Sequence, residues 1–139
     1  RPFTVEGHTN WLENVVNTGK AAQFVIYEKD SDFPVGSVFL RDIDYQNRKA
    51  EYGIFIGEDS ARGKGIGTEA AKSIVQYGFS ELKLHKIFLR VLADNKGAIK
   101  SYENAGFVQE AYLKDEVFLN GEYRDIVLMA LINPERSAE

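Results

Sequence analysis

The stretch Tyr52–Thr68, YGIFIGEDSARGKGIGT, decides the fold, because an apolar strand-like segment runs into a glycine-rich basic loop that opens a helix. The loop alternates glycines, which lack a Cβ and let a ligand approach the main chain, with positive charge. The helix that follows begins with unpaired N–H donors and a partial positive charge. The stretch therefore predicts an anion pocket of the kind that holds a pyrophosphate. The residues concerned are Arg62, Gly63, Lys64, Gly65 and Gly67.

Two familiar glycine motifs do not fit this loop. A Walker loop requires GxxxxGK[ST], but Lys64 is followed by Gly65. The position five before Gly63 is also Glu58, where the motif has glycine. The dinucleotide fingerprint requires GxGxxG, and Thr68 stands where its third glycine belongs. The remaining alternatives are a pyrophosphate loop of another type and a plain glycine-rich turn before an ordinary helix.

Composition limits the class of protein. With 139 residues, 44% hydrophobic and 12% aromatic, the chain is sized for one domain with one core. It contains no cysteine, which excludes disulfides, thiolate nucleophiles and zinc sites built from cysteine. It has no apolar run long enough to span a bilayer and no charged-then-apolar leader, so we expect a soluble, cytoplasmic protein. The formal charge of -4 argues against nucleic acid as a partner and favours a cationic substrate.

Hydrophobic periodicity predicts an amphipathic helix over roughly residues 5–18, with Thr4 as its N-cap and Gly19 at its end. Segments rich in β-branched and aromatic residues predict strands at 22–28, 35–43 and 50–56, the first two forming a hairpin. Two more helices are predicted at 65–81 and 96–105, the latter closed by Gly106, with a central strand between them at 86–92. Strands 107–119 and 122–131 flank Asn120-Gly121, a strong hairpin signal. This order predicts an α/β sandwich with a mixed sheet.

Two motifs resemble those of a known family. The pattern Arg62-x-x-Gly65-x-Gly67 after a strand resembles the pyrophosphate signature of the GNAT superfamily of acyl-CoA-dependent N-acetyltransferases. The segment Asn95–Phe107, NKGAIKSYENAGF, resembles the second GNAT signature at its expected distance from the first. Together with the hairpin FLNGEYRD, it is most similar to bacterial spermidine, ribosomal-protein N-terminal and amino-sugar acetyltransferases. The resemblance covers nearly the whole chain.

The resemblance implies a GNAT-like fold over residues 1–139 as one acetyltransferase domain. Such a fold has a mixed, mostly antiparallel sheet, with splayed central strands and helices on both faces. Four strands precede the glycine-loop helix in GNAT domains, and three are visible in this sequence. We therefore expect the first strand, and the start of the first helix, upstream of Arg1.

The resemblance also implies acetyl transfer from acetyl-CoA to an amine, by direct attack in a ternary complex without metal. Tyr102 matches the family tyrosine that gives a proton to the departing thiolate, or it is a buried structural tyrosine. Glu51 matches the carboxylate that removes the amine proton through water, or it is a salt-bridged strand carboxylate. Asn95 contacts the pantetheine or caps a helix. The implied cofactor-binding residues are Ile54, Phe55, Ile56, Arg62, Gly63, Lys64, Gly65, Ile66, Gly67, Thr68 and Asn95, with Lys96 or Lys100 as further phosphate contacts.

The sequence does not decide whether the acceptor is a polyamine, a protein N-terminus or an amino sugar. Acidic residues of the last hairpin suit a polyamine or form its solvated face; they are Glu110, Asp115, Glu116 and Glu122. His8 and His85 lack partners at ligand spacing and are expected to be structural. No nucleic-acid or membrane partner is expected, and the apolar terminal hairpin suits a homodimer. The rival hypothesis is a non-catalytic acyl-CoA-binding sensor on the same fold.

Overall fold

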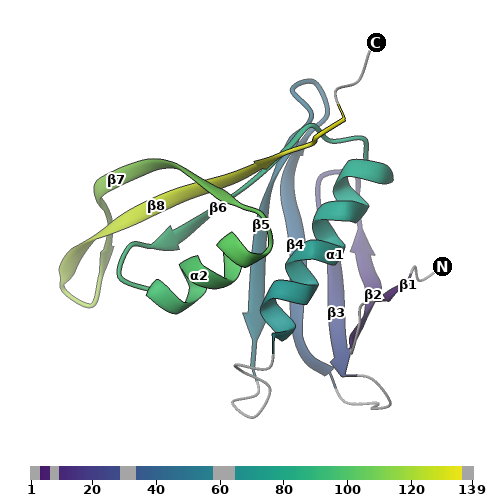
Figure 1. The fold of residues 1–139 in the computed structure, drawn as a ribbon, viewed down its shortest axis with the longest axis horizontal. Helices are drawn as coiled ribbons and strands as arrows, with labels where there is room; N and C mark the ends of the chain where they lie inside the picture. The colour runs from purple at the N-terminus through teal and green to yellow at the C-terminus, as the bar shows by residue number, and fades with distance from the viewer. Residues whose placement is uncertain (1–3, 7–9, 29–33, 58–64, 136–139) are drawn as a thin grey trace.

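The strands pair into one eight-stranded sheet in the order β1-β2-β3-β4-β5-β6-β8-β7, in a computed structural model that describes residues 4–6, 10–28, 34–57 and 65–135 (Figure 1). Neighbouring strands are antiparallel except β5 and β6, which are parallel. The sheet is therefore mixed and mostly antiparallel, as the sequence predicts. The elements are β1 Thr4–Glu6, β2 Asn10–Asn17, β3 Ala22–Glu28, β4 Pro34–Asp44, β5 Lys49–Ile56, α1 Ile66–Ser80, β6 Lys86–Leu92, α2 Lys96–Asn104, β7 Val108–Leu119 and β8 Glu122–Ile132.

Both predicted hairpins form. β3 and β4 pair antiparallel, with Phe24 opposite Val38. β7 and β8 are joined at Asn120 and Gly121, whose φ angles of 51° and 84° are both left-handed, as a tight two-residue turn between twisted strands requires. Local turn chemistry thus accounts for the β7–β8 pairing, because Asn120 and Gly121 match the conformation that this turn demands.

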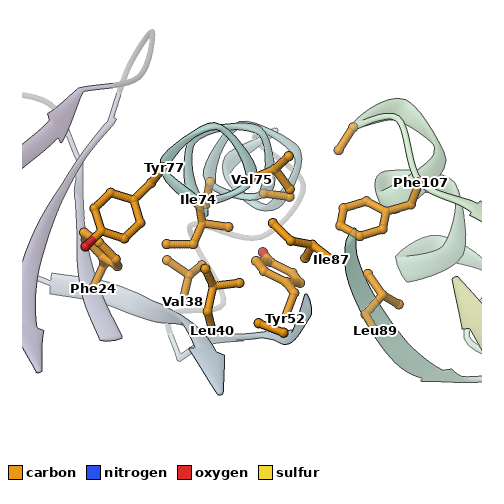
Figure 2. Close-up of a cluster of buried hydrophobic side chains, with 14 of the residues drawn as sticks. Phe24, Val38, Leu40, Tyr52, Ile74, Val75, Tyr77, Ile87, Leu89 and Phe107 are labelled. Atoms are coloured by element: carbon orange, nitrogen blue, oxygen red, sulfur yellow. The ribbon is translucent and has the colours of Figure 1, made fainter. Parts of the chain in front are cut away.

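The core lies between α1 and the sheet. Alternate residues of β3, β4 and β5 point toward α1, where Phe24, Leu40 and Tyr52 surround Ile74 (Figure 2). All four are at most 3% exposed. α2 lies beside α1 on the same face of the sheet, held by a hydrogen bond between their side chains (Figure 1). Neither described helix is long and apolar enough to cross a membrane.

The helix predicted over residues 5–18 is wrong. Thr4–Glu6 and Asn10–Asn17 are strands, and β2 pairs antiparallel with β3. The segment is short and carries Val15 and Val16, so helical spacing and strand propensity compete. Pairing with β3 decides between them, because it satisfies an edge that would otherwise be unpaired. Thr4 is then no helix cap, and Gly19 lies in the turn before β3 with φ 87°.

This correction changes the arrangement around the sheet. Five strands, not three, precede α1 among the described residues. With strands in this segment, the described helices are α1 and α2, which lie side by side (Figure 1). A further strand upstream of Arg1 stays a prediction. His8 lies outside the described residues.

Candidate active site

The central strands β5 and β6 separate after a short parallel contact. They pair at three positions, Lys49 with Lys86, Ala50 with Ile87, and Glu51 with Phe88. Both strands then continue without pairing to each other, β5 to Ile56 and β6 to Leu92. The sheet is therefore forked as predicted, and β5 presents main-chain groups on its open side.

A cleft of about 680 Å³ occupies the open end of this fork. Its walls come from the end of β5, the first turn of α1 and one side of α2. The structure thus brings together residues predicted from separate motifs: Ile54, Phe55, Ile56, Gly65, Gly67, Thr68, Asn95 and Tyr102. Gly97, Ala98, Lys100, Ser101 and Asn104 complete the lining.

The N-terminus of α1 opens onto the cleft at Gly65. Gly65 has φ 78°, a left-handed conformation that suits glycine, and no described side chain caps the helix there. The N–H groups of the first turn are therefore available to an anion, and the helix dipole favours one. The helix begins at Ile66, one residue after the predicted start, and Ile66 is not among the residues that line the cleft. Arg62, Gly63 and Lys64 lie outside the described residues.

Contact between α1 and α2 depends on small residues. The hydroxyls of Thr68 and Ser101 are 2.9 Å apart, within hydrogen-bond distance. A Cβ on Gly67 would lie 3.5 Å from Ser101 Oγ, an ordinary contact, so this position has room for a methyl group and little more. Ser101 was not singled out from the sequence, because its role depends on a residue 33 positions away. Thr68, predicted as a phosphate contact, also joins the two helices.

Asn95 sets the start of α2. Its Oδ1 accepts a hydrogen bond of 3.1 Å from the N–H of Ala98, so the side chain is a helix cap that also lines the cleft. Gly106, with φ 107°, follows the end of the helix. Of the two lysines suggested for phosphates, Lys100 lines the cleft and Lys96 does not.

Tyr102 faces the cleft from the middle of α2. Its ring packs edge-to-face against Tyr52 and Phe107, with centroids 6.1 and 6.0 Å away. Burial raises the pKa of Tyr102 above that of a free tyrosine, so the phenol keeps its proton at neutral pH. Within the described part of the chain, no hydrogen bond engages its hydroxyl. Ring packing thus holds Tyr102 in place beside the cleft.

Glu51 lies at the root of the fork, on the face of β5 opposite Tyr52. It is 5% exposed and accepts hydrogen bonds from Arg41 and Arg90. It does not line the cleft. Of the acidic residues suggested for the acceptor, Glu110 forms an ion pair of 2.8 Å with Lys86. The others, Asp115, Glu116 and Glu122, are exposed on the terminal hairpin.

Comparisons with known proteins agree with this geometry. The sequence profile of the acetyltransferase (GNAT) domain matches residues 1–108. Spermidine N(1)-acetyltransferase from Vibrio cholerae is 36% identical over 110 residues, covering 79% of this chain and 62% of that protein. The probable N-acetyltransferase YjcK from Bacillus subtilis is 35% identical over 140 residues, covering 96% of this chain and 75% of that protein.

A solved structure matches as well. The crystal structure of spermidine N-acetyltransferase from Vibrio cholerae in complex with CoA and spermine superposes with a TM-score of 0.77 at 35% identity. The match covers 82% of this chain and 66% of that one. This chain therefore spans less than two thirds of the length of the Vibrio cholerae protein.

Proposed function

Because this chain belongs to the GNAT acetyltransferase family, we propose that it transfers an acetyl group from acetyl-CoA to a primary amine. One observation carries the proposal: a single cleft combines the end of β5 beyond its pairing with β6, the N-terminus of α1 and the phenol of Tyr102. These three features supply a thioester site, a diphosphate site and a proton donor, which together are what acetyl transfer from CoA requires.

The cleft fits the parts of acetyl-CoA in order. Its volume is in the usual range for small-molecule sites. The N–H groups at the start of α1 suit the diphosphate. β5 does not pair with β6 beyond Glu51, so the main chain of Ile54 and Phe55 on the fork side can pair with the pantetheine amides. One N–H there would stabilise the developing charge on the thioester oxygen.

The proposed reaction is direct attack in a ternary complex. The amine nitrogen bonds to the thioester carbonyl carbon, the carbon–sulfur bond breaks, and CoA departs as a thiolate. Tyr102 gives that thiolate its phenolic proton, the attacking nitrogen loses one proton to solvent, and the Tyr102 phenolate takes a proton back from solvent. The position of Tyr102 supports this assignment, because its phenol is protonated at neutral pH and the residue lines the cleft.

A polyamine is the proposed acceptor. Relatives of this chain are spermidine N-acetyltransferases, and the formal charge of -4 suits a cationic substrate. A protein N-terminus and an amino sugar are the alternatives. A panel of spermidine, an N-terminal peptide and glucosamine, each with acetyl-CoA, separates them. Because the chain has no cysteine, a thiol reagent reports released CoA alone.

Replacing Tyr102 by Phe tests the mechanism. We expect kcat to fall about 100-fold, the usual contribution of a general acid. Acetyl-CoA affinity should change less than about twofold, because Tyr102→Phe keeps the ring that packs on Tyr52 and Phe107. Steady-state kinetics and calorimetric titration measure the two quantities.

The same experiment addresses the rival hypothesis. A sensor module would bind acetyl-CoA without releasing CoA in the presence of any amine of the panel, and Tyr102→Phe would then alter nothing measurable. Turnover by the unmodified protein that survives Tyr102→Phe unchanged would instead remove Tyr102 from the mechanism and leave the activity in place.

A further inference from the structure

Glu51 joins three neighbouring strands. It is the one buried charged residue within the described ranges. Its Oε1 accepts hydrogen bonds from Nε of Arg41 on β4, at 3.4 Å, and from Nη2 of Arg90 on β6, at 3.3 Å. Its Oε2 accepts one from Nε of Arg90 at 3.0 Å. Both carboxylate oxygens are therefore engaged by guanidinium donors.

This cluster stands where the fork begins. The pair of Glu51 and Phe88 is the last contact between β5 and β6. Arg90 lies two residues further along β6, beyond that last contact, and its guanidinium reaches back to Glu51. Arg41 is the direct partner of Glu51 on β4. The ion pairs thus tie the strands together across the point of separation.

The surroundings do not suit Glu51 to accept the amine proton. A general base needs an oxygen within hydrogen-bond reach of the amine or of a connecting water. On the face of Glu51, the next residue toward the open end is Gly53, and a Cβ there would meet the ring of Phe39 at 2.1 Å. The ring therefore lies over Gly53, between Glu51 and the open end of β5. Arg41 stacks on the same ring, with its guanidinium carbon 5.3 Å from the centroid.

We propose that Glu51 is a positioning residue, which with Arg41 and Arg90 fixes where β5 and β6 separate. This inference rests on the proposed function, because the separation sets the place of the Ile54–Ile56 main chain against the thioester. It replaces the general-base hypothesis for Glu51. The acceptor then binds as the free amine, or loses its proton to solvent. The carboxylates of Asp42 and Glu116 also stabilise the positive charge of Arg90.

Variants of Glu51 and Arg90, made singly and together, distinguish a positioning role of Glu51 from a role as general base. Arg90→Met leaves the buried carboxylate with Arg41 alone, and Glu51→Gln leaves two guanidinium groups without their acceptor. Glu51 is buried, whereas the two arginine side chains are about half exposed. Leaving a buried charge without its partner is costly, whereas removing the charge together with its partner is often close to neutral. We expect Arg90→Met to raise the KM for acetyl-CoA about tenfold with kcat nearly unchanged, a size typical of coupled neighbours. In the double variant, which combines Arg90→Met with Glu51→Gln, the KM for acetyl-CoA should return to within about threefold of the value for the unmodified protein.

The matched control is Lys86→Met, which breaks the ion pair with Glu110 at the closed end of β6. This pair is partly exposed, so its loss should leave the KM for acetyl-CoA unchanged. Spermidine is the acceptor probe. The pH profile of kcat/KM should rise with the fraction of free amine, in the same way for the unmodified protein and for the double variant.

Hydrogen–deuterium exchange tests the positioning role without cofactor. Arg90→Met should speed amide exchange around residues 49–51 of β5, and the double variant should slow it again. Unchanged exchange in Arg90→Met would overturn the proposal. So would a double variant that loses about 100-fold or more in kcat together with the acidic limb of its pH profile, because that pattern identifies a base. If the unmodified protein neither binds acetyl-CoA nor releases CoA, the proposed function fails, and the exchange data still decide the role of Glu51.

Discussion

The two edges of β6 are built differently. Along one edge β6 pairs with β8 at seven positions, from Lys86 with Ile132 to Leu92 with Ile126. Along the other it pairs with β5 at three. One edge is closed and the other opens into the cleft. The comparison shows that the candidate site lies where the pairing between two neighbouring strands stops.

Burial follows the same division. At the closed edge Leu89 and Met129 are 2% and 0% exposed. At the open edge Ile54 and Ile56 are partly buried, and Phe55 is 64% exposed. We therefore expect substitutions at the closed edge to change stability, and substitutions at the open edge to change binding.

The largest effect is expected at the open edge, from Gly67→Leu. A Cβ at this position has ordinary contacts, at 3.5 Å from Ser101 Oγ and 3.9 Å from Ile56 Cδ1. A longer side chain would extend into the cleft, while leucine favours the helix. Calorimetric titration should show the Kd for acetyl-CoA raised more than about 1000-fold, or about 4 kcal/mol.

Gly67→Ala is the matched control, and its Kd should stay within about threefold because a single methyl fits the space. If Gly67→Leu kept its affinity for acetyl-CoA, the cofactor would have to bind away from the fork. The contrast between a structural edge and a binding edge of β6 would then be wrong.

At the closed edge, Met129→Ala should lower the free energy of unfolding by about 3 kcal/mol, because it empties space in a fully buried position. Urea denaturation measures this loss. Acetyl-CoA affinity at low temperature, where the variant is folded, should remain unchanged. Met129→Leu keeps the volume and should cost less than about 1.5 kcal/mol. Lost affinity with full stability would show that the closed edge takes part in binding.

The smallest effect is expected for Tyr52→Phe, between the two edges. The hydroxyl of Tyr52 is buried without a hydrogen-bond partner among the described residues, so its removal should raise the free energy of unfolding by up to about 1 kcal/mol. A clear loss of stability would mean that the hydroxyl is paired.

The pH dependence of stability sharpens this test. Burial raises the pKa of Tyr52 well above its ordinary value, so the folded protein keeps the neutral phenol. The unfolded chain ionises near the ordinary value of about 10. The stability that comes from keeping Tyr52 neutral is therefore complete below that pH, and it is lost as the pH rises above it. Urea denaturation at alkaline pH should show a smaller loss for Tyr52→Phe than for the unmodified protein.

Much of the fold was accessible from the sequence. The predicted strands 22–28 and 86–92 have the bounds that the structure shows, and the helices after the glycine loop and after Asn95 differ by a residue or so. These elements carry their own signals in period, caps and turn residues. The segment 5–18 carries a weak signal, and pairing with β3 overrides it. Strand pairing depends on residues that are distant in the chain, so local pattern cannot fix it.

The candidate site divides in the same way. The positions of Gly65, Gly67, Asn95 and Tyr102 along the cleft follow from two motifs. The ion pairs of Glu51 do not, because Arg90 is 39 positions away and becomes a neighbour only when β6 lies against β5.

By itself, the sequence determined the elements from β3 onward and several residues that line the cleft, because side-chain period and turn chemistry act over a few residues. The tertiary structure alone decided where β5 and β6 part, which face Glu51 takes and which arginines hold it. Strand edges present the same backbone N–H and C=O groups whatever the side chains are. Only the packing of the whole sheet therefore determines which edge stays open.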